Sequence, residues 1–166
     1  MMAVRLAKTA MVGSLAAYSL LVAYHNVVDH GTNYEFVRHV LSMDTTFPGN
    51  ALKGHAITAP ELWAVAYWMI IIVEAVNGLV LAWATLRLAI NLRGPAERFN
   101  AAKDVVIVGA GLGFLLWFLG FMVVGGEWFA MWQSKDWNGQ EPAFRFYVTL
   151  LLVALLVCQP DRDRGD

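Results

Sequence analysis

The sequence predicts an all-α fold: an integral membrane four-helix bundle, N-in and C-in, with a short amphipathic helix in its first outer loop. Three observations support this. Apolar residues make up 58% of the chain and charged residues only 15%, against about 45–50% and about 25% in soluble domains. The mean hydropathy is +0.53. The apolar residues also gather in four separate runs, each of about the length of a membrane-spanning helix.

The first run, Thr9–Val28, follows the cations Arg5 and Lys8. A positively charged start before an apolar run resembles a signal peptide. However, this run is about 20 residues long, which is enough to cross about 30 Å of hydrocarbon. It also continues into a strongly apolar chain. We therefore expect an uncleaved membrane helix over about 6–28.

The remaining runs are Leu62–Ile90, Asp104–Gly125 and Ala143–Cys158. They predict helices over about 62–90, 104–125 and 143–158, because an open strand in lipid would leave backbone groups unpaired. Pro142 suits the first turn of the last helix, and Pro160 lies just past its end. The chain 1–166 then forms a single transmembrane domain with outer loops at 29–61 and 126–142.

The basic residues predict the orientation of the four helices. Eight of the 12 Lys and Arg residues fall on the side of the two termini, and four fall on the other side: Arg38, Lys53, Lys135 and Arg145. Cytoplasmic connections of membrane proteins carry an excess of Lys and Arg. Both termini are therefore predicted to lie inside.

The first outer loop contains apolar residues at helical spacing, notably Tyr34, Val37 and Leu41. The segment Asn33–Met43 is therefore predicted to form a short amphipathic helix on the outer membrane surface. Thr32 or Asn33 is a suitable cap for its first turn.

A glycine-rich stretch, Gly109-Ala110-Gly111-Leu112-Gly113, imitates a dinucleotide-binding fingerprint. That fingerprint requires a glycine where this chain has Phe114, and it requires a βαβ unit downstream. The sequence instead continues as an unbroken apolar run. Small residues four apart let helix backbones approach closely in lipid, so close helix packing is the better interpretation.

Glu74 lies near the middle of the second apolar run, with Asn77 less than one turn away. A carboxylate at this depth costs about 2.5–3.5 kcal/mol and normally faces the bundle interior or water. It could act as a proton relay or as a polar contact for a ligand or quinone. It could equally be a hydrogen-bonded group that fixes helix packing through Asn77 or an indole. The residues alone leave both interpretations open.

All four histidines, His25, His30, His39 and His55, fall in the outer half of the first helix or in the first loop. Together with nearby carboxylates they could bind zinc or copper, and His25 could pair with a loop histidine to hold haem. Their spacing matches no compact metal motif, so we predict no metal and no cofactor. His25, His39 and His55 are kept as weak candidates.

The outer loop after the third run is rich in aromatic residues. It carries Trp128, Trp132 and Trp137 between Glu127 and Arg145. Tryptophan favours the headgroup layer of a bilayer, and it is also a common anchor of binding patches. The loop is therefore predicted either to anchor at the membrane surface or to dock a partner protein. In the first case, an ion pair between Glu127 and Arg145, or pairs of these two residues with Lys135 and Asp136, would staple it.

Two classes of function find no support. Neither Cys158 nor Ser134 has a base placed by sequence to activate it, so no catalytic residue is predicted and the chain is expected not to be an enzyme. The net charge is −1, so there is no basic patch for nucleic acid.

Several motifs together resemble a bacterial family of predicted small integral membrane proteins, known as domain of unknown function 2165. The motifs are Asn26-x-x-Asp29-x-Gly31-Thr32-Asn33, Phe36 to Pro48, Tyr67-Trp68 with Glu74, Ala102-Lys103, Gly125 to Ser134, Trp137 to Gln140, and Ala143-Phe144-Arg145. The resemblance spans nearly the whole chain, except the tail Asp161–Asp166. It implies a multi-pass protein of the bacterial inner membrane and no particular activity.

The leading prediction is a non-enzymatic accessory or scaffold subunit that contacts the lipid bilayer and a larger membrane complex, or a second copy of itself. The small size and the tryptophan-rich outer loop favour it. An alternative is a small transporter or proton-conducting unit that uses Glu74. A further alternative is a membrane redox protein with haem or metal at the outer histidines.

Overall fold

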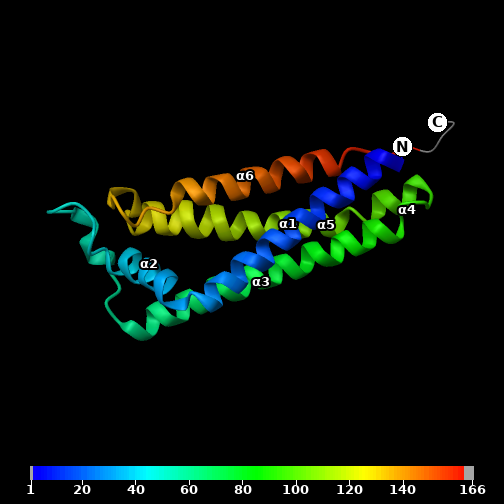
Figure 1. Cartoon of the computed structure of the whole chain (residues 1–166). Coiled ribbons are helices and arrows are strands. Elements are labelled where there is room, and N and C mark those ends of the chain that lie inside the picture. The colour runs from blue at the N-terminus through cyan, green and yellow to red at the C-terminus, as the bar shows by residue number, and fades with distance from the viewer. Residues whose placement is uncertain (1, 163–166) are drawn as a thin grey trace.

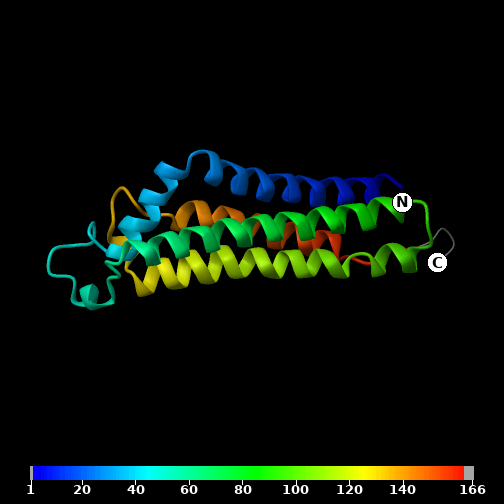
Figure 2. The same cartoon turned by 90° about the horizontal axis from the view of Figure 1, so that it is seen from below.

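The computed structural model describes residues 2–162, and every regular element in that range is helical. Four long helices lie side by side, and the first and last described residues lie at the same end of the bundle (Figure 1). We call this the terminal end. The opposite end, which we call the loop end, carries the two longest connections (Figure 2).

Four helices within residues 2–162 are long and apolar enough to cross a membrane: Met2–Val28, Pro60–Ile90, Ala96–Trp128 and Gln140–Val157. This confirms the four spans predicted from the sequence. Large apolar side chains are exposed along all four, including Leu21, Leu79, Leu115 and Leu155. Water would not tolerate such extended apolar faces on a monomer, whereas lipid does.

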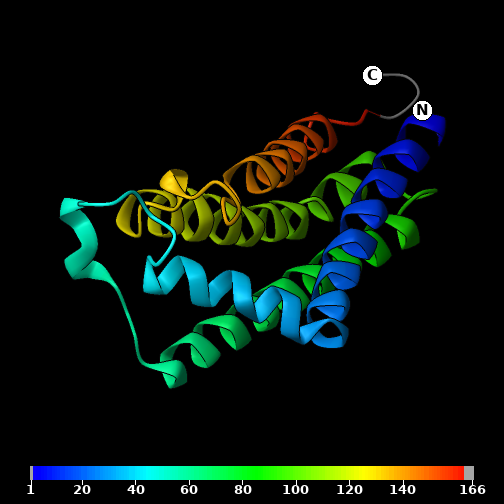
Figure 3. The same cartoon turned by 60° about the vertical axis from the view of Figure 1, so that its left-hand side comes forward.

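The first half of the chain contains α1 (Met2–Val28), α2 (His30–Ser42), the short 3₁₀-helix η1 (Ala51–His55) and α3 (Pro60–Ile90). Helix α2 begins at His30 and its N-cap is Asp29, so neither Thr32 nor Asn33 caps it as predicted. It crosses the loop end from the end of α1 towards the later loop (Figure 3). Pro60 begins α3, because its fixed backbone suits a first turn.

The second half contains α4 (Ala96–Ala101), α5 (Asp104–Phe114), the π-helix η2 (Leu115–Trp128), the 3₁₀-helix η3 (Met131–Gln133) and α6 (Gln140–Val157). Gly94 and Pro95 separate α3 from α4, as a helix stop should. The 14-residue π-helix η2 was not predicted. Such helices are usually a single turn long and are frequent at functional sites.

Glycines mark the closest approaches between helices. A Cβ added to Gly78 would lie 2.7 Å from Leu20, and one added to Gly109 would lie 2.6 Å from Leu81. At Gly113 the nearest atom would be Leu150 Cδ1, at 2.5 Å. The glycine-rich stretch therefore serves helix packing, as the sequence predicted.

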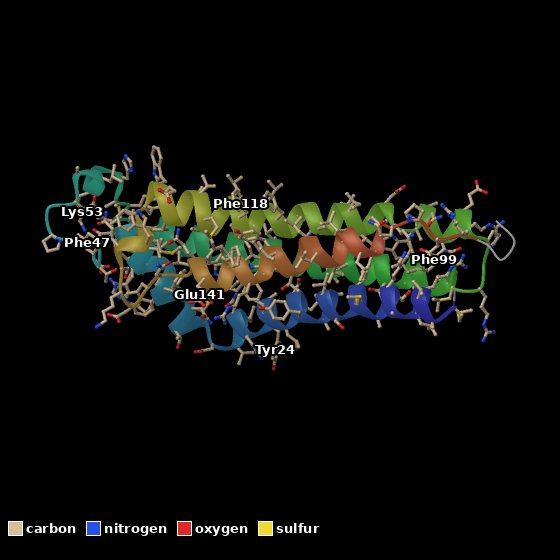
Figure 4. All side chains as sticks on the ribbon, turned by 90° about the horizontal axis from the view of Figure 1, so that it is seen from above. Tyr24, Phe47, Lys53, Phe99, Phe118 and Glu141 are labelled. Atoms are coloured by element: carbon tan, nitrogen blue, oxygen red, sulfur yellow. The ribbon has the colours of Figure 1, made fainter. Side chains whose placement is uncertain are left out.

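The described part of the core contains four apolar clusters, one of which joins α2 to α3 through Val37, Tyr67 and Ile71. At the terminal end it contains the fully buried Leu88 and Phe99. In the middle Trp117 packs with Leu150, and at the loop end Met43 packs with Met131. Phe99 lies among the helices, whereas Tyr24 projects from the bundle surface (Figure 4).

Candidate functional site

Helix α3 places Glu74 inside the bundle, where the residue is only 2% exposed. Its hydrogen-bond partner is neither Asn77 nor an indole, the two partners considered from the sequence, but Asn26 at the end of α1: Asn26 Nδ2 donates to Glu74 Oε2 at 2.7 Å. The Tyr67 hydroxyl donates to the Asn26 carbonyl oxygen at 2.6 Å and holds that residue in place. No described residue forms an ion pair with Glu74.

Asn77, the second predicted intramembrane polar residue, has a separate role. It is fully buried, and its Nδ2 donates to Ser19 Oγ on α1 at 3.1 Å. Its side-chain oxygen has no hydrogen-bond partner among the described residues. Asn77 therefore links α3 to α1 less than one turn beyond Glu74, whereas Glu74 lines a cavity.

A cavity of about 220 Å³ lies beside Glu74. Helices α1, α2, α3, α6 and η2 all contribute to its wall. Its polar lining consists of Glu74, Asn26 and Asn33. The remaining wall is mainly aromatic, with Phe36, Tyr67, Trp117, Phe121 and Phe146. A pocket with an aromatic wall and a few convergent polar groups is the usual form of a small-molecule site.

An apolar groove of about 500 Å³ continues from this cavity between α2, α3 and η2. The groove and the cavity share Phe36, Val37, Ile70 and Phe121. Gly120 of the π-helix lines the groove, and a Cβ there would meet no atom closer than 4.0 Å. The groove therefore extends the Glu74 cavity with a purely apolar space.

At the loop end, the tryptophan-rich connection packs against the first loop. His39 stacks on Trp137 with ring centroids 4.5 Å apart, and His55 stacks on Trp128 at 4.2 Å. Thr45 Oγ1 donates to Ser134 Oγ at 2.8 Å. The two loops, which lie about 90 residues apart in sequence, thus form one unit.

The remaining predicted loop residues lie on the surface of this unit. Glu127, Trp128 and Trp132 are exposed, while Trp137 is half-buried. The predicted staple between Glu127 and Arg145 is wrong: Arg145 instead pairs with Glu141, one turn away on α6. Ring stacks and hydrogen bonds join the two loops in place of that ion pair.

His39 belongs to a polar network on the outside of α2. Its Nδ1 lies 2.7 Å from Asp44 Oδ1, and Arg38 pairs with both Glu35 and Asp44. Partial burial opposes ionisation of Asp44, but the hydrogen bond from His39 and the charge of Arg38 outweigh it, so the pKa of Asp44 lies below its usual value.

The family of predicted small integral membrane proteins, domain of unknown function 2165, matches residues 4–160 of the chain. The chain belongs to this family. It is an integral membrane protein with four candidate spans. Comparison with curated proteins gives no match, and neither does comparison with solved structures.

In this small integral membrane protein the histidines are spread over the loop end. His25 lies beside Tyr24, and His30 stacks on Tyr34 and meets Tyr67 edge-on. Among residues 2–162, no three His, Cys, Asp or Glu side chains come close enough together to hold a metal ion. Each imidazole contacts an aromatic ring instead.

The terminal end holds a buried charge cluster that the sequence analysis missed. Lys8 Nζ and Lys103 Nζ both lie 2.6 Å from Asp161 Oδ2, and both donate to the Gln159 carbonyl oxygen at 2.7 Å. Arg5 Nε lies 3.8 Å from Asp161 Oδ1. The side chains of Arg5, Lys8, Lys103 and Asp161 are each only 6% exposed.

Burial would raise the pKa of Asp161, but the hydrogen bonds from Lys103 and Lys8 outweigh it and hold that pKa below its usual value. The sequence signal for this cluster is the placement of Arg5, Lys8 and Lys103 near the ends of predicted helices, a pattern that by itself indicates only the orientation. Asp161 lies just past the family match. It is the first residue of the tail that lies outside the family resemblance.

Proposed function

We propose that this protein is a non-enzymatic accessory or scaffold subunit of a larger membrane complex in a bacterial inner membrane. Both termini then lie in the cytoplasm, and the loop end faces outwards with α2 at the outer membrane surface. The excess of Lys and Arg at the terminal end supports this orientation, because cytoplasmic sides of membrane proteins are richer in these residues.

The observation that carries the proposal is an exposed aromatic surface on a fixed backbone. Trp128, Trp132 and Phe47 are 57%, 49% and 56% exposed. Phe47 and Trp132 meet edge-on with ring centroids 5.9 Å apart. Exposed tryptophans are frequent anchors of protein interfaces.

The backbone beneath these rings is held by contacts between the two loops. Phe47 N donates to Gln133 Oε1 at 3.1 Å, and His55 Nδ1 lies 2.9 Å from the Trp128 carbonyl oxygen. Ordering loops on binding costs free energy, so a surface that is already ordered binds more tightly. These contacts support a docking role for the surface.

Purification of a tagged copy from mild detergent tests the docking role. We expect a membrane protein to co-purify in a fixed ratio with the wild type and to be lost from Trp132→Ala. Trp83→Ala is the matched control, because Trp83 is 55% exposed on α3, away from the loop surface. Recovery of the tagged protein alone, or equal loss from both variants, would contradict the proposal.

A second candidate is a proton-conducting or transport unit that uses Glu74. The buried carboxylate, its bond to Asn26 and the cavity beside it favour this function, because intramembrane acids commonly mark ion or substrate pathways. Purified protein in liposomes should conduct protons, and Glu74→Gln should abolish the flux. Equal flux from both proteins would exclude this function.

A further inference from the structure

We propose that the cavity at Glu74 binds an organic cation, whose apolar body extends into the groove between α2, α3 and η2. This site lies within the bundle, apart from the exposed aromatic surface to which we assign docking. The two assignments can therefore fail independently.

The first argument concerns charge. Glu74 is buried and contributes a carboxylate to the cavity wall. Among the described residues that line the cavity there is no Lys, Arg or His. Asn26 supplies one neutral hydrogen bond to Oε2. An ionised carboxylate away from water is costly, so it either takes up a proton or is compensated by a cation. A cationic ligand would provide the charge that the protein itself does not place there.

The second argument concerns the walls. Aromatic faces attract cations, and the attraction is strongest where water is excluded. Trp117 and Tyr67 are both only 2% exposed, and three phenylalanines complete the lining. The hydroxyl proton of Tyr67 is engaged with the Asn26 carbonyl oxygen. The cavity therefore offers a carboxylate and aromatic rings, which together fit a substituted ammonium group better than an anion.

The third argument concerns the ligand body. The cavity holds about 220 Å³, and the adjoining groove about 500 Å³. The groove wall consists of apolar residues, and Gly120 leaves part of it open. A ligand that binds both spaces must therefore join a cationic head to an apolar chain or ring, as in a lipophilic amine.

The test uses the full-length protein in nanodiscs of phosphatidylcholine, with benzyltrimethylammonium as the probe and neopentylbenzene as its neutral isostere. We expect the cation to bind at least about tenfold more tightly than the isostere. Glu74→Gln keeps the shape of the side chain and should remove this preference. Glu61→Gln, at the exposed start of α3, should not. Equal affinity for both compounds would overturn the proposal, as would an unchanged preference in Glu74→Gln.

The groove is tested separately with benzyldimethyloctylammonium. The octyl chain should increase the affinity of the wild type, and Gly120→Leu should remove that gain by filling the groove. Binding of benzyltrimethylammonium itself should be unchanged in Gly120→Leu. If the octyl chain still increases the affinity in Gly120→Leu, the octyl chain lies in bulk lipid, and the assignment of the groove is overturned.

A measurement on the wild type covers the case in which Glu74→Gln does not fold. Photolysis with 4-azidobenzyltrimethylammonium should label peptides that contain the cavity residues Tyr67, Trp117 or Phe146. An excess of benzyltrimethylammonium should suppress that labelling. Label found only at outward-facing residues such as Leu79 and Leu155, or labelling that the excess does not suppress, would contradict a site at Glu74.

Discussion

The two ends of the bundle are each closed by long-range contacts, but with different chemistry. At the terminal end, Lys8 and Lys103 share the carboxylate of Asp161 in a cluster that is almost fully buried. At the loop end, the contacts are ring stacks and hydrogen bonds, such as His39 on Trp137 and Thr45 to Ser134. The charged pairs at the loop end are more exposed than this cluster, and in the pair of Arg145 with Glu141 the side chains are 73% and 75% exposed.

This difference indicates which interactions stabilise each end of the bundle. A buried charge depends strongly on its partner, because the charge left behind cannot be solvated. An exposed pair is worth little, because water screens it and can replace either partner. We therefore expect the terminal end to respond sharply to single changes of charge, and the loop end to respond to changes of shape.

The largest effect is expected from Asp161→Asn. It leaves Lys8 and Lys103 buried without an opposite charge, and breaking a buried pair in this way costs about 3 kcal/mol. Unfolding in mixed micelles, followed by tryptophan fluorescence, measures the free energy of unfolding. The matched control is Glu141→Gln, whose pair with Arg145 is more than 70% exposed and should contribute less than about 0.5 kcal/mol. Similar losses from both variants would show that the terminal cluster is no stronger than a surface pair.

The same cluster predicts a dependence on pH. Because the folded protein lowers the pKa of Asp161, its contribution is complete above the unfolded-state value of about 3.9. It disappears as the pH falls through the lower folded-state pKa. The stability difference between wild type and Asp161→Asn should thus be constant from about pH 5 to 7 and shrink only below about pH 4. A difference that shrinks already between pH 5 and 7 would contradict this sign.

A smaller effect is expected at the loop end from Gly139→Ala. The added Cβ would lie 2.7 Å from Phe36 Cζ and 3.3 Å from Phe121 Cδ1, so two rings must move. Overpacking of this kind costs about 1–3 kcal/mol. Gly31→Ala is the control, because a Cβ there meets nothing within 4 Å and Ala favours the helix. Thermal unfolding should separate the two variants, and equal midpoints would show that the loop contact is loose.

The smallest effect is expected from Trp137→Leu. Leucine keeps the apolar character of this half-buried position but removes the stack on His39, which should cost about 0.5–1.5 kcal/mol. The loss should be local, so amide exchange should quicken around residues 36–45 and stay unchanged at the terminal end. Faster exchange throughout the bundle would mean that the stack supports the whole fold.

Much of the fold could be predicted because membrane spans leave a local signal. Long apolar runs identified all four spans, and Gly94-Pro95 marked the stop after the second. The packing role of Gly109 and Gly113 followed from their spacing of four residues. Each of these inferences depends on neighbours in sequence and on the general properties of lipid.

The candidate site was predicted only in part. Glu74 stood out because a carboxylate is rare at membrane depth, but its partner Asn26 lies 48 positions away and on another helix. The π-helix left no signal in the sequence that we recognised. The stacks of His39 on Trp137 and of His55 on Trp128 join loops that are distant in sequence, so no local pattern indicates them.

The sequence by itself determined that four helices meet lipid and that one carboxylate lies among them. In hydrocarbon, backbone groups must be paired within a helix, and a charged side chain must face the bundle interior or water. Only the tertiary structure decided which side chains meet. The pairing of Lys8 with Asp161, 153 positions apart, depends on how α1 and α6 pack against each other. The cavity beside Glu74 likewise exists only because five helices each bring two or three residues to one place, and no local sequence pattern shows this.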